Sequence, residues 1–331
     1  MIVKAGFIGT GGISPVHLDV LKARKDVKMV ALCDRVEQSV KDKQSRYGGR
    51  SYLDFNAMLN QEKLDAVWLC TPPEVREEPL IACAKRGIPV FCEKPAEHSA
   101  AHALQIATKL DKLDAKVQVG YVFRSNQVIQ ALKKRLTQDR IHLVQSFYGC
   151  GVSLDMSLPA WFYDKDKSGG ALIDQATHNL DLLRFLFGEV VEVKGFALNP
   201  LKTKKPGYTI DETIALSLRF ENGILASHIH TWIGDGWRNE IILSGEKALY
   251  RVNPGSKLLV DQQGHNPLKA KANGKNSSNV IEQKGSIYAD ENDVFIKMVK
   301  TGDWSINPSP YRDAVKTLQL TLICDKAVSK K

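Results

Sequence analysis

Short apolar runs alternate with amphipathic segments along the first third of the chain. The apolar runs are Ala5–Ile8, Val27–Cys33, Ala66–Cys70, Pro89–Cys92 and Val117–Val119. Patterns of helical period lie between them, near residues 15–25, 36–46, 54–60, 74–86 and 98–113. Nearly continuous apolar strands separated by helices are typical of a parallel sheet with helices on both faces. We therefore expect a doubly wound α/β domain over residues 1–122, with its functional residues just after the strands.

A different pattern begins at about residue 123. An amphipathic helix over 127–136, a strand near 144–152 and a helix over 171–187 lead into a series of strand-like runs. These runs are 190–198, 212–220, 224–232, 238–244, 248–252 and 257–261. Gly, Asn and Pro separate them, which favours hairpins, and a last helix is expected over about 310–329. Residues 123–331 are thus predicted to form an α+β domain with a large, mostly antiparallel sheet.

Length and composition agree with two globular domains. The chain has 331 residues, of which 43% are hydrophobic and 25% charged. It has no apolar run as long as a membrane span, and its first strand begins too early to leave room for a secretory leader. We expect a cytoplasmic protein without membrane contact.

Cysteine and charge patterns exclude two other classes of site. None of the six cysteines forms a Cys-x-x-Cys pair, so buried free thiols are expected and no metal site. The net charge of +9 raises the question of nucleic-acid binding. The basic residues are scattered, however, and no aromatic residues interleave with the densest groups, Lys202–Lys205 and Lys269–Lys275. We therefore expect a solvated basic surface and no nucleic-acid partner.

The first apolar run leads directly into a glycine-rich turn. Gly9-Thr10-Gly11-Gly12-Ile13-Ser14 reads Gly-x-Gly-x-x-Ser, and a helix is expected from Pro15. The second run ends on Asp34, twenty residues after Ser14. Strand, glycine turn, helix, strand and acid in this order are typical of a dinucleotide-binding βαβ unit, in which the helix N-terminus meets the pyrophosphate. The alternative is an ordinary βα turn whose glycines serve loop geometry alone.

Two further clusters contain groups suited to acid–base chemistry. Lys94, in Glu93-Lys94-Pro95, follows a buried strand, where an ammonium can exchange a proton or hold a substrate oxygen. Asp174 and His178 are four residues apart on a predicted helix, so the acid can orient the imidazole. Taken singly, each is more often a surface feature, and no third ligand accompanies Asp174 and His178 for a metal ion.

In this order the three clusters resemble the glucose–fructose oxidoreductase, inositol dehydrogenase and rhizopine-catabolism (Gfo/Idh/MocA) family. Other matching stretches are Cys70-Thr71-Pro72-Pro73, Gly120-Tyr121-x-x-Arg124 and Gly169-Gly170. The family often has a histidine shortly after the Thr-Pro-Pro turn, where this chain has Val75-Arg76-Glu77.

The resemblance implies a role for each matching residue. Lys94, Asp174 and His178 would form the catalytic group, with the choice of Lys94 or His178 as main acid–base group left open. Arg124 and Trp161 would join these three residues in binding substrate. The cofactor would be held by Gly9, Thr10, Gly11, Gly12, Ile13, Asp34, Arg35, Thr71, Pro72, Glu93 and Lys94.

The resemblance also implies an activity. The chain would be an NAD(P)-dependent oxidoreductase acting on a sugar or cyclitol, and would assemble as a homodimer or homotetramer. Asp34 favours NAD, because a carboxylate repels a 2′-phosphate, while Arg35 leaves NADP open. Two alternatives remain: a glycosidase that uses NAD transiently, and a non-catalytic dinucleotide sensor. The identity of the sugar and the physiological direction are not encoded in these motifs.

Overall fold

The computed structural model describes residues 1–154, 160–200, 207–234, 236–262 and 279–329. It divides into two compact units, one of residues 1–125 and 286–318, the other of residues 126–285 and 319–331. The expected division at residue 122 is close to the first crossing of the chain. Residues 286–318, however, had been expected in the second domain and belong to the first unit. The basic groups at 202–205 and 269–275 fall outside the described residues.

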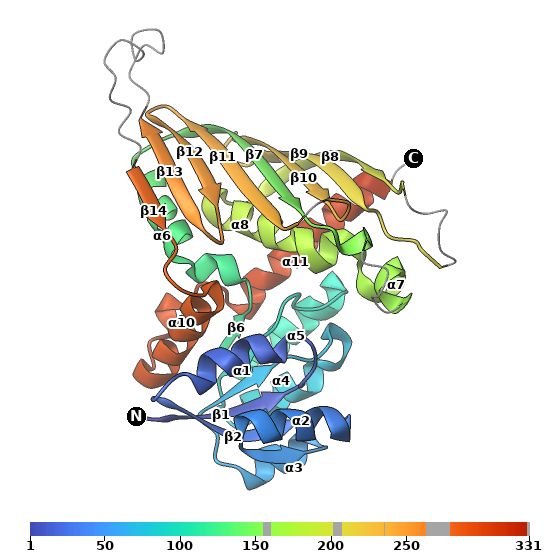
Figure 1. The fold of residues 1–331 in the computed structure, drawn as a ribbon, viewed down its shortest axis with the longest axis vertical. Helices are drawn as coiled ribbons and strands as arrows, with labels where there is room; N and C mark the ends of the chain where they lie inside the picture. Colours follow the sequence, from blue (N-terminus) through green and yellow to red (C-terminus); the bar gives the residue numbers. More distant parts are fainter. Residues whose placement is uncertain (155–159, 201–206, 235, 263–278, 330–331) are drawn as a thin grey trace. The chain divides into compact units, whose positions relative to one another are not determined.

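The first unit contains a parallel sheet of six strands in the order β3-β2-β1-β4-β5-β6 (Figure 1). This order confirms the doubly wound sheet, because the direction of winding reverses between β1 and β4. The strands are β1 (Val3–Ile8), β2 (Val27–Cys33), β3 (Arg50–Tyr52), β4 (Ala66–Leu69), β5 (Val90–Cys92) and β6 (Val117–Val119). Strand β3 was not predicted, because its sequence Arg-Ser-Tyr has no apolar run.

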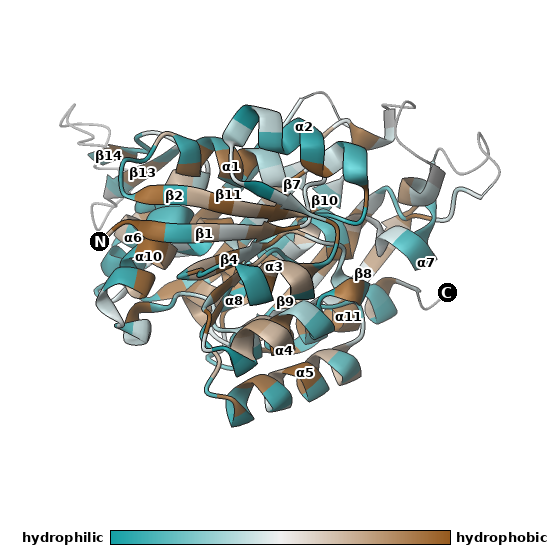
Figure 2. Cartoon of the chain, turned by 90° about the horizontal axis from the view of Figure 1, so that it is seen from below, coloured by the Kyte–Doolittle hydropathy of each residue, from teal (hydrophilic) through white to brown (hydrophobic). Residues whose placement is uncertain are grey.

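Helices cover this sheet and follow their amphipathic patterns. They are α1 (Ser14–Lys22), α2 (Glu37–Tyr47), α3 (Phe55–Gln61), α4 (Glu77–Lys85), α5 (Ala100–Lys112) and α10 (Ile287–Thr301). Figure 2 shows apolar and polar residues alternating around α5, whose buried residues Ala103, Ile106, Ala107 and Leu110 recur at helical spacing. Buried residues of α1, α2 and α10 share one core with β1, β2, β4 and β5.

Helix α10 explains why residues 286–318 belong to the first unit. It packs against α1 and against the 3₁₀ turn η2 (Val122–Ser125). Its Phe295 lies edge-on to Trp68 of β4, with ring centroids 5.1 Å apart. Trp68 in turn stacks on Phe7 of β1 at 5.7 Å. The C-terminal segment therefore supplies part of the core of the N-terminal sheet, which a local reading of the sequence could not reveal.

The second unit contains the predicted, mostly antiparallel sheet, with eight strands in the order β14-β13-β12-β11-β7-β10-β9-β8. Among the strand pairs of this second sheet within the described residues, only β7 and β10 run parallel. Its strands are β7 (Ile141–Gly149), β8 (Val190–Leu198), β9 (Thr213–Phe220), β10 (Leu225–Thr231), β11 (Arg238–Gly245), β12 (Ala248–Asn253), β13 (Lys257–Gln262) and β14 (Asn279–Glu282).

One face of this sheet is covered and the other is open within the described residues. Helix α6 (Gln127–Leu136) packs on β13 and β14, and α8 (Thr177–Phe187) lies on the same face (Figure 1). Residues of β9 and β10 alternate strictly between buried and solvent-facing positions. The last helix, α11 (Tyr311–Ser329), is confirmed where it was predicted, and the boundary between the units falls within it, after Leu318.

Candidate active site

The glycine turn after β1 brings two strand ends into close contact. Gly9 has a φ of +90°, and a Cβ there would lie 2.7 Å from the backbone of Cys70 and of Thr71. Only glycine fits this position. At Gly11 and Gly12 a Cβ would meet no atom within 4 Å, so the backbone of the turn faces open space before α1 begins at Ser14. This arrangement suits a phosphate group, which needs bare backbone at a helix start.

Asp34 lies at the end of β2 and is tied to the glycine turn. Its Oδ2 accepts hydrogen bonds from the backbone N of Thr10 at 2.7 Å and from Thr10 Oγ1 at 2.9 Å. Its Oδ1 accepts from the backbone N of Val36 at 2.9 Å. The acid is thus held in one orientation beside the turn, which is the position expected for a group that meets the adenosine ribose.

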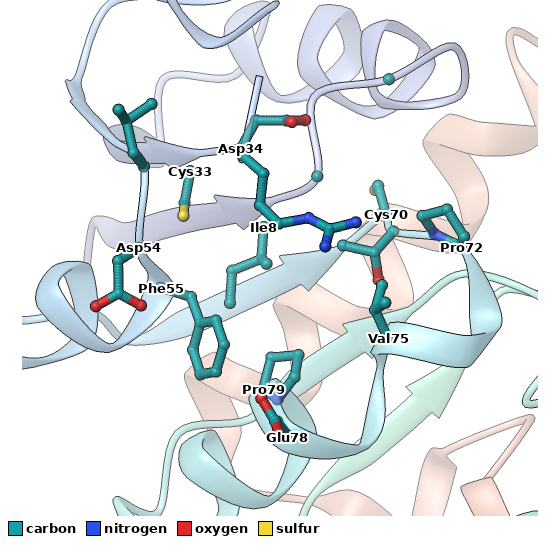
Figure 3. A pocket seen from close by; sticks show the side chains of 15 residues that line it. Ile8, Cys33, Asp34, Asp54, Phe55, Cys70, Pro72, Val75, Glu78 and Pro79 are labelled. Atoms are coloured by element: carbon teal, nitrogen blue, oxygen red, sulfur yellow. The ribbon is translucent and has the colours of Figure 1, made fainter. Parts of the chain in front are cut away.

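A cleft of about 340 Å³ opens at these strand ends (Figure 3). Of the predicted cofactor residues, Gly9, Gly11, Asp34, Arg35, Thr71 and Pro72 line it. Figure 3 shows Asp34 on one side and Phe55, Glu78 and Pro79 on the other. Sequence reasoning missed this second side, because it is built by the residues after the unpredicted strand β3 and by the first turn of α4. The cleft fits the flat base and ribose of a dinucleotide.

Glu93 and Lys94 follow β5 at the same edge of the sheet. Glu93 is 5% exposed, and its Oε1 lies 2.8 Å from His17 Nε2 of α1. Its Oε2 accepts from the backbone N of Lys94 at 3.0 Å. Burial acts to raise the pKa of Glu93, but the hydrogen bond from His17, with the charges of Lys94 and Arg76, holds that pKa below its usual range. Glu93 is therefore a buried carboxylate, as its predicted place near the cofactor requires.

Arg76 connects the loop that carries Lys94 to the cleft. Its side chain donates to the carbonyl oxygen of Thr71, from Nε at 2.9 Å and from Nη2 at 2.6 Å. It also donates to the carbonyl oxygens of Glu93 and Pro95 from Nη1, and to that of Lys94 from Nη2 at 3.5 Å. Arg76 is 3% exposed. The sequence marked this position only as a departure from the family pattern, and gave it no role.

In the second unit, Asp174 and His178 lie where the helix geometry changes. Asp174 is in a π-helical turn, Leu172–Ala176, and His178 is the second residue of α8. The predicted continuous α-helix is therefore wrong at this point. The side chains of Asp174 and His178 are both half-buried, whereas the residues next to each of them are buried. π-Turns are frequent at functional sites, because they turn one side chain out of the regular helical series.

Neighbouring residues hold this π-turn in place. Gly169 has a φ of +77°, and a Cβ there would lie 2.8 Å from Ile173 Cβ. Glycine is therefore sterically required at this position before the turn. Gln175 Oε1 accepts from Trp232 Nε1 at 2.8 Å and from Cys150 Sγ at 3.2 Å, which fastens the turn to the sheet. Asp174 thus projects from a rigid support.

Trp161 and Arg124, the two residues predicted to bind substrate without any other role, differ in how exposed their side chains are. Trp161 is 53% exposed and its ring lies 5.9 Å from that of Phe162, so its face is accessible. Arg124 is 2% exposed, and its Nη1 donates to Asp313 Oδ2 at 2.5 Å and to the carbonyl of Pro308 at 2.9 Å. This guanidinium is committed to the C-terminal segment of its own unit. Its role in substrate binding stays a prediction, and in this structure the side chain bonds within the first unit.

The structure therefore brings the cofactor residues together within one unit. Glu93 and Lys94 share that unit with the cleft, whereas Trp161, Asp174 and His178 belong to the other. Thr10 contacts the cleft residue Asp34, while Gly12, Ile13, Glu93 and Lys94 are outside the lining of the cleft itself.

Comparisons with known proteins agree with these observations. Residues 3–121 match the Gfo/Idh/MocA model described as an oxidoreductase family with an NAD-binding Rossmann fold, and residues 129–251 match its C-terminal domain. A myo-inositol 2-dehydrogenase of Thermotoga maritima is 27% identical over 91% of this chain and 89% of its own length. A D-glucoside 3-dehydrogenase of Escherichia coli is 25% identical over 67% of this chain and 68% of its own.

Solved structures support the same fold. A myo-inositol dehydrogenase from Corynebacterium glutamicum has a TM-score of 0.81 at 17% identity, covering 99% of this chain and 97% of that one. An oxidoreductase from Agrobacterium radiobacter, in complex with NAD⁺, L-tartaric acid and magnesium, has a TM-score of 0.83 at 18% identity, covering 100% and 97%.

Proposed function

The chain belongs to the Gfo/Idh/MocA family of NAD-binding oxidoreductases, and we propose that it transfers a hydride between a nicotinamide cofactor and a secondary alcohol or ketone of a sugar, cyclitol or sugar derivative. One observation carries the choice of reaction. Lys94 stands at the carboxyl end of β5, in the same unit as the glycine-turn cleft and beside the buried carboxylate of Glu93. A cation in that position serves a reacting oxygen.

The cofactor residues have complementary tasks in this proposal. The turn from Gly9 to Ile13 receives the pyrophosphate, and Asp34 accepts hydrogen bonds from the adenosine ribose. Thr71 supports this fit, because its Oγ1 is buried without a hydrogen-bond partner among the described residues and lines the same cleft. The bound nicotinamide supplies the hydride acceptor. We propose NAD as the working cofactor, since Asp34 presents a fixed carboxylate where NADP has its extra phosphate.

The acid–base work falls to Lys94, Asp174 and His178. When a carbinol is oxidised, its C–H leaves as hydride and its O–H leaves as a proton, so one base must take that proton. His178 is proposed to take it while Asp174 orients the imidazole. Lys94 holds the substrate oxygen and stabilises the negative charge that develops on it. Substitution of each in turn decides which of Lys94 and His178 is the main acid–base group.

Two observations favour a sugar-like substrate. The accessible ring of Trp161 suits the apolar face of a sugar ring. The relatives named for myo-inositol and D-glucoside oxidation align with this chain over most of its length.

The open face of the sheet in the second unit supports a homo-oligomer. One row across β8, β9, β10 and β7 reads Phe196, Ala215, Ile229 and Phe147. Phe196 is 82% exposed and its neighbour Leu198 is 65% exposed. An apolar patch of this kind on a sheet is typically covered by another chain. We propose that a second copy covers it, as a homodimer or as part of a homotetramer.

The thiols support a proposal for the cellular location. All six cysteines are free and buried, which is usual in a reducing compartment. No helix of the described residues is long and apolar enough to cross a membrane. We propose that the protein acts in the cytoplasm.

The proposal is tested by following NADH formation on a panel of sugars, sugar acids, amino sugars and inositols, with NAD and NADP in parallel. We expect a signal that falls about 10²–10⁴-fold in His178→Ala, the range for a lost acid–base group, while NAD binding is retained. Lys94→Ala is expected to abolish the signal as well. Activity that survives in both variants would refute the assigned roles. Release of free sugar without net NADH would instead indicate a redox glycosidase.

A further inference from the structure

A chain of polar side chains crosses the apolar core of the first unit and ends on Glu93. Trp68 Nε1 of β4 donates to Asn292 Oδ1 of α10 at 2.8 Å. Asn292 Nδ2 lies 3.0 Å from His17 Nδ1, and His17 Nε2 lies 2.8 Å from Glu93 Oε1. Trp68, Asn292 and His17 are all fully buried. Buried polar groups of this kind must be satisfied by one another, because no water reaches them.

The chemistry of the partners fixes the direction of every hydrogen bond in this chain. The indole N–H of Trp68 can only donate, so Asn292 must turn its oxygen towards it. The backbone carbonyl of Tyr288 can only accept, and it receives Asn292 Nδ2 at 2.7 Å, which requires the same amide orientation. The other N–H of Nδ2 therefore points to His17 Nδ1. That nitrogen accepts and carries no proton, so the ring proton is on Nε2 and is donated to Glu93.

The result is a carboxylate that is held as an acceptor. Glu93 receives His17 on Oε1 and the backbone N–H of Lys94 on Oε2. A Cβ at Gly120 would lie 3.3 Å from Glu93 Oε1, tighter than an ordinary contact, so a glycine there leaves the carboxylate room. The nearby Glu291 behaves in the opposite way. Burial, with the charge of Glu93, raises the pKa of Glu291 well above its usual range, and neither of its oxygens has a hydrogen-bond partner within the described residues.

The strand order says which half of a dinucleotide Glu93 would meet. A dinucleotide lies across the point where the winding reverses, here between β1 and β4. Asp34, after β2, is on the adenosine side of that point. Glu93, after β5, is on the other side, where the nicotinamide half would lie.

We propose that Asn292, whose amide is oriented by Trp68, is a positioning residue which acts through His17 to hold Glu93 ionised beside the nicotinamide half of the cofactor, and so favours binding of the oxidised form. This inference rests on the proposed function. The nicotinamide ring is positively charged when oxidised and neutral when reduced. A fixed carboxylate nearby therefore stabilises the oxidised form selectively, and more strongly than a solvated carboxylate would because Glu93 is buried.

The first test measures the tautomer directly and needs no substrate or cofactor. The full-length protein labelled with ¹⁵N-histidine is examined by NMR, and the His17 signal is assigned by its loss in His17→Gln. We expect the Nε2–H tautomer in the wild type. In Asn292→Leu, the lost donor should produce a mixture of tautomers. Met298→Ala removes a buried side chain from the same helix without touching the polar chain, and should leave the tautomer unchanged. An Nδ1–H tautomer in the wild type would overturn the inference.

The second test compares the dissociation constants of NAD⁺ and NADH by calorimetry. In His17→Leu, we expect NAD⁺ to bind about tenfold more weakly and NADH to change by less than about twofold. Asn292→Leu should act in the same direction. His17→Gln should restore the wild-type ratio, because its amide oxygen can accept from Asn292 while its amide nitrogen donates to Glu93. Met298→Ala controls for lost stability and should keep the ratio.

The outcomes separate this inference from the proposed function. If both forms bind and their ratio is unchanged in His17→Leu, the inference is overturned while the proposed function stands. If neither form binds the wild type, the proposed function fails, and the selective role of Glu93 fails with it.

Discussion

Replacing Arg76 tests whether one buried side chain joins the catalytic loop to the nucleotide cleft. Its guanidinium donates to the carbonyl oxygens of Thr71, Glu93, Lys94 and Pro95, which come from the ends of β4 and β5. A guanidinium has five donors in a fixed planar fork and can serve all four carbonyls at once, whereas the ammonium of a lysine has three donors. Arg76→Met keeps most of the apolar stem and removes every donor.

The expected cost follows from the acceptors left behind. A buried carbonyl that loses its donor costs about 1–3 kcal/mol, and three of the four carbonyls are firmly bonded to Arg76. Water that enters the vacated space offsets part of this sum. We expect Arg76→Met to lower the free energy of unfolding by about 3–5 kcal/mol. Arg76→Lys should fall between this variant and the wild type.

The assay combines denaturant unfolding with turnover. Arg86→Met is the matched control, because Arg86 also flanks α4, at its opposite end, and donates to the carbonyl of Ala82, but it is exposed. We expect that control to stay within about 0.5 kcal/mol of the wild type. Since Arg76 holds the backbone on both sides of Lys94, kcat should fall more than NAD affinity. A stability of Arg76→Met equal to that of Arg86→Met would refute the reasoning.

Three further changes probe separate parts of the molecule. Asp34→Ala should weaken NAD binding about 10- to 100-fold, the value of a lost charged hydrogen bond, and weaken NADP less; equal weakening of both in calorimetry would place Asp34 away from the ribose. Phe196→Lys should convert the oligomer to monomers in sedimentation, because it places a charge on the open sheet face; an unchanged assembly would require another interface. Hydrogen bonds from Arg24 and Lys300 hold the pKa of Asp26 below its usual range, so the stability it contributes is present at neutral pH and is lost as the pH falls through that lowered value. Asp26→Asn should therefore reduce the acid-dependent part of thermal unfolding, and an identical pH dependence would contradict this.

The parts of the site that local sequence determines were predictable. Glycine is required at position 9 because the turn after β1 passes close to the backbone that follows β4, and Asp34 comes at the end of the next apolar run. These residues lie close together in the chain, and the alternation of strand and helix places them at one edge of the sheet. The helix that carries Asp174 and His178 was predictable only in part. A helix was expected there, but its π-turn is held by Gln175, whose partners Trp232 and Cys150 directly follow the distant strands β10 and β7.

Helix α10 shows why the hydrophobic pattern of the sequence did not predict the buried polar residues of the first unit. Its inward face carries Glu291 and Asn292 where an ordinary surface helix has apolar residues. No element was predicted over Ile287–Thr301, and residues 123–331 were all expected in the second domain, so neither the helix nor its return to the first unit was predicted. The partners of Asn292 are 224 and 275 residues away in the sequence. Asn292 weakens the hydrophobic signal of this face because it bonds to specific partners instead of packing against apolar side chains. In this chain those partners lead to Glu93, so the segment hardest to predict is the one that sets the charge beside the cofactor.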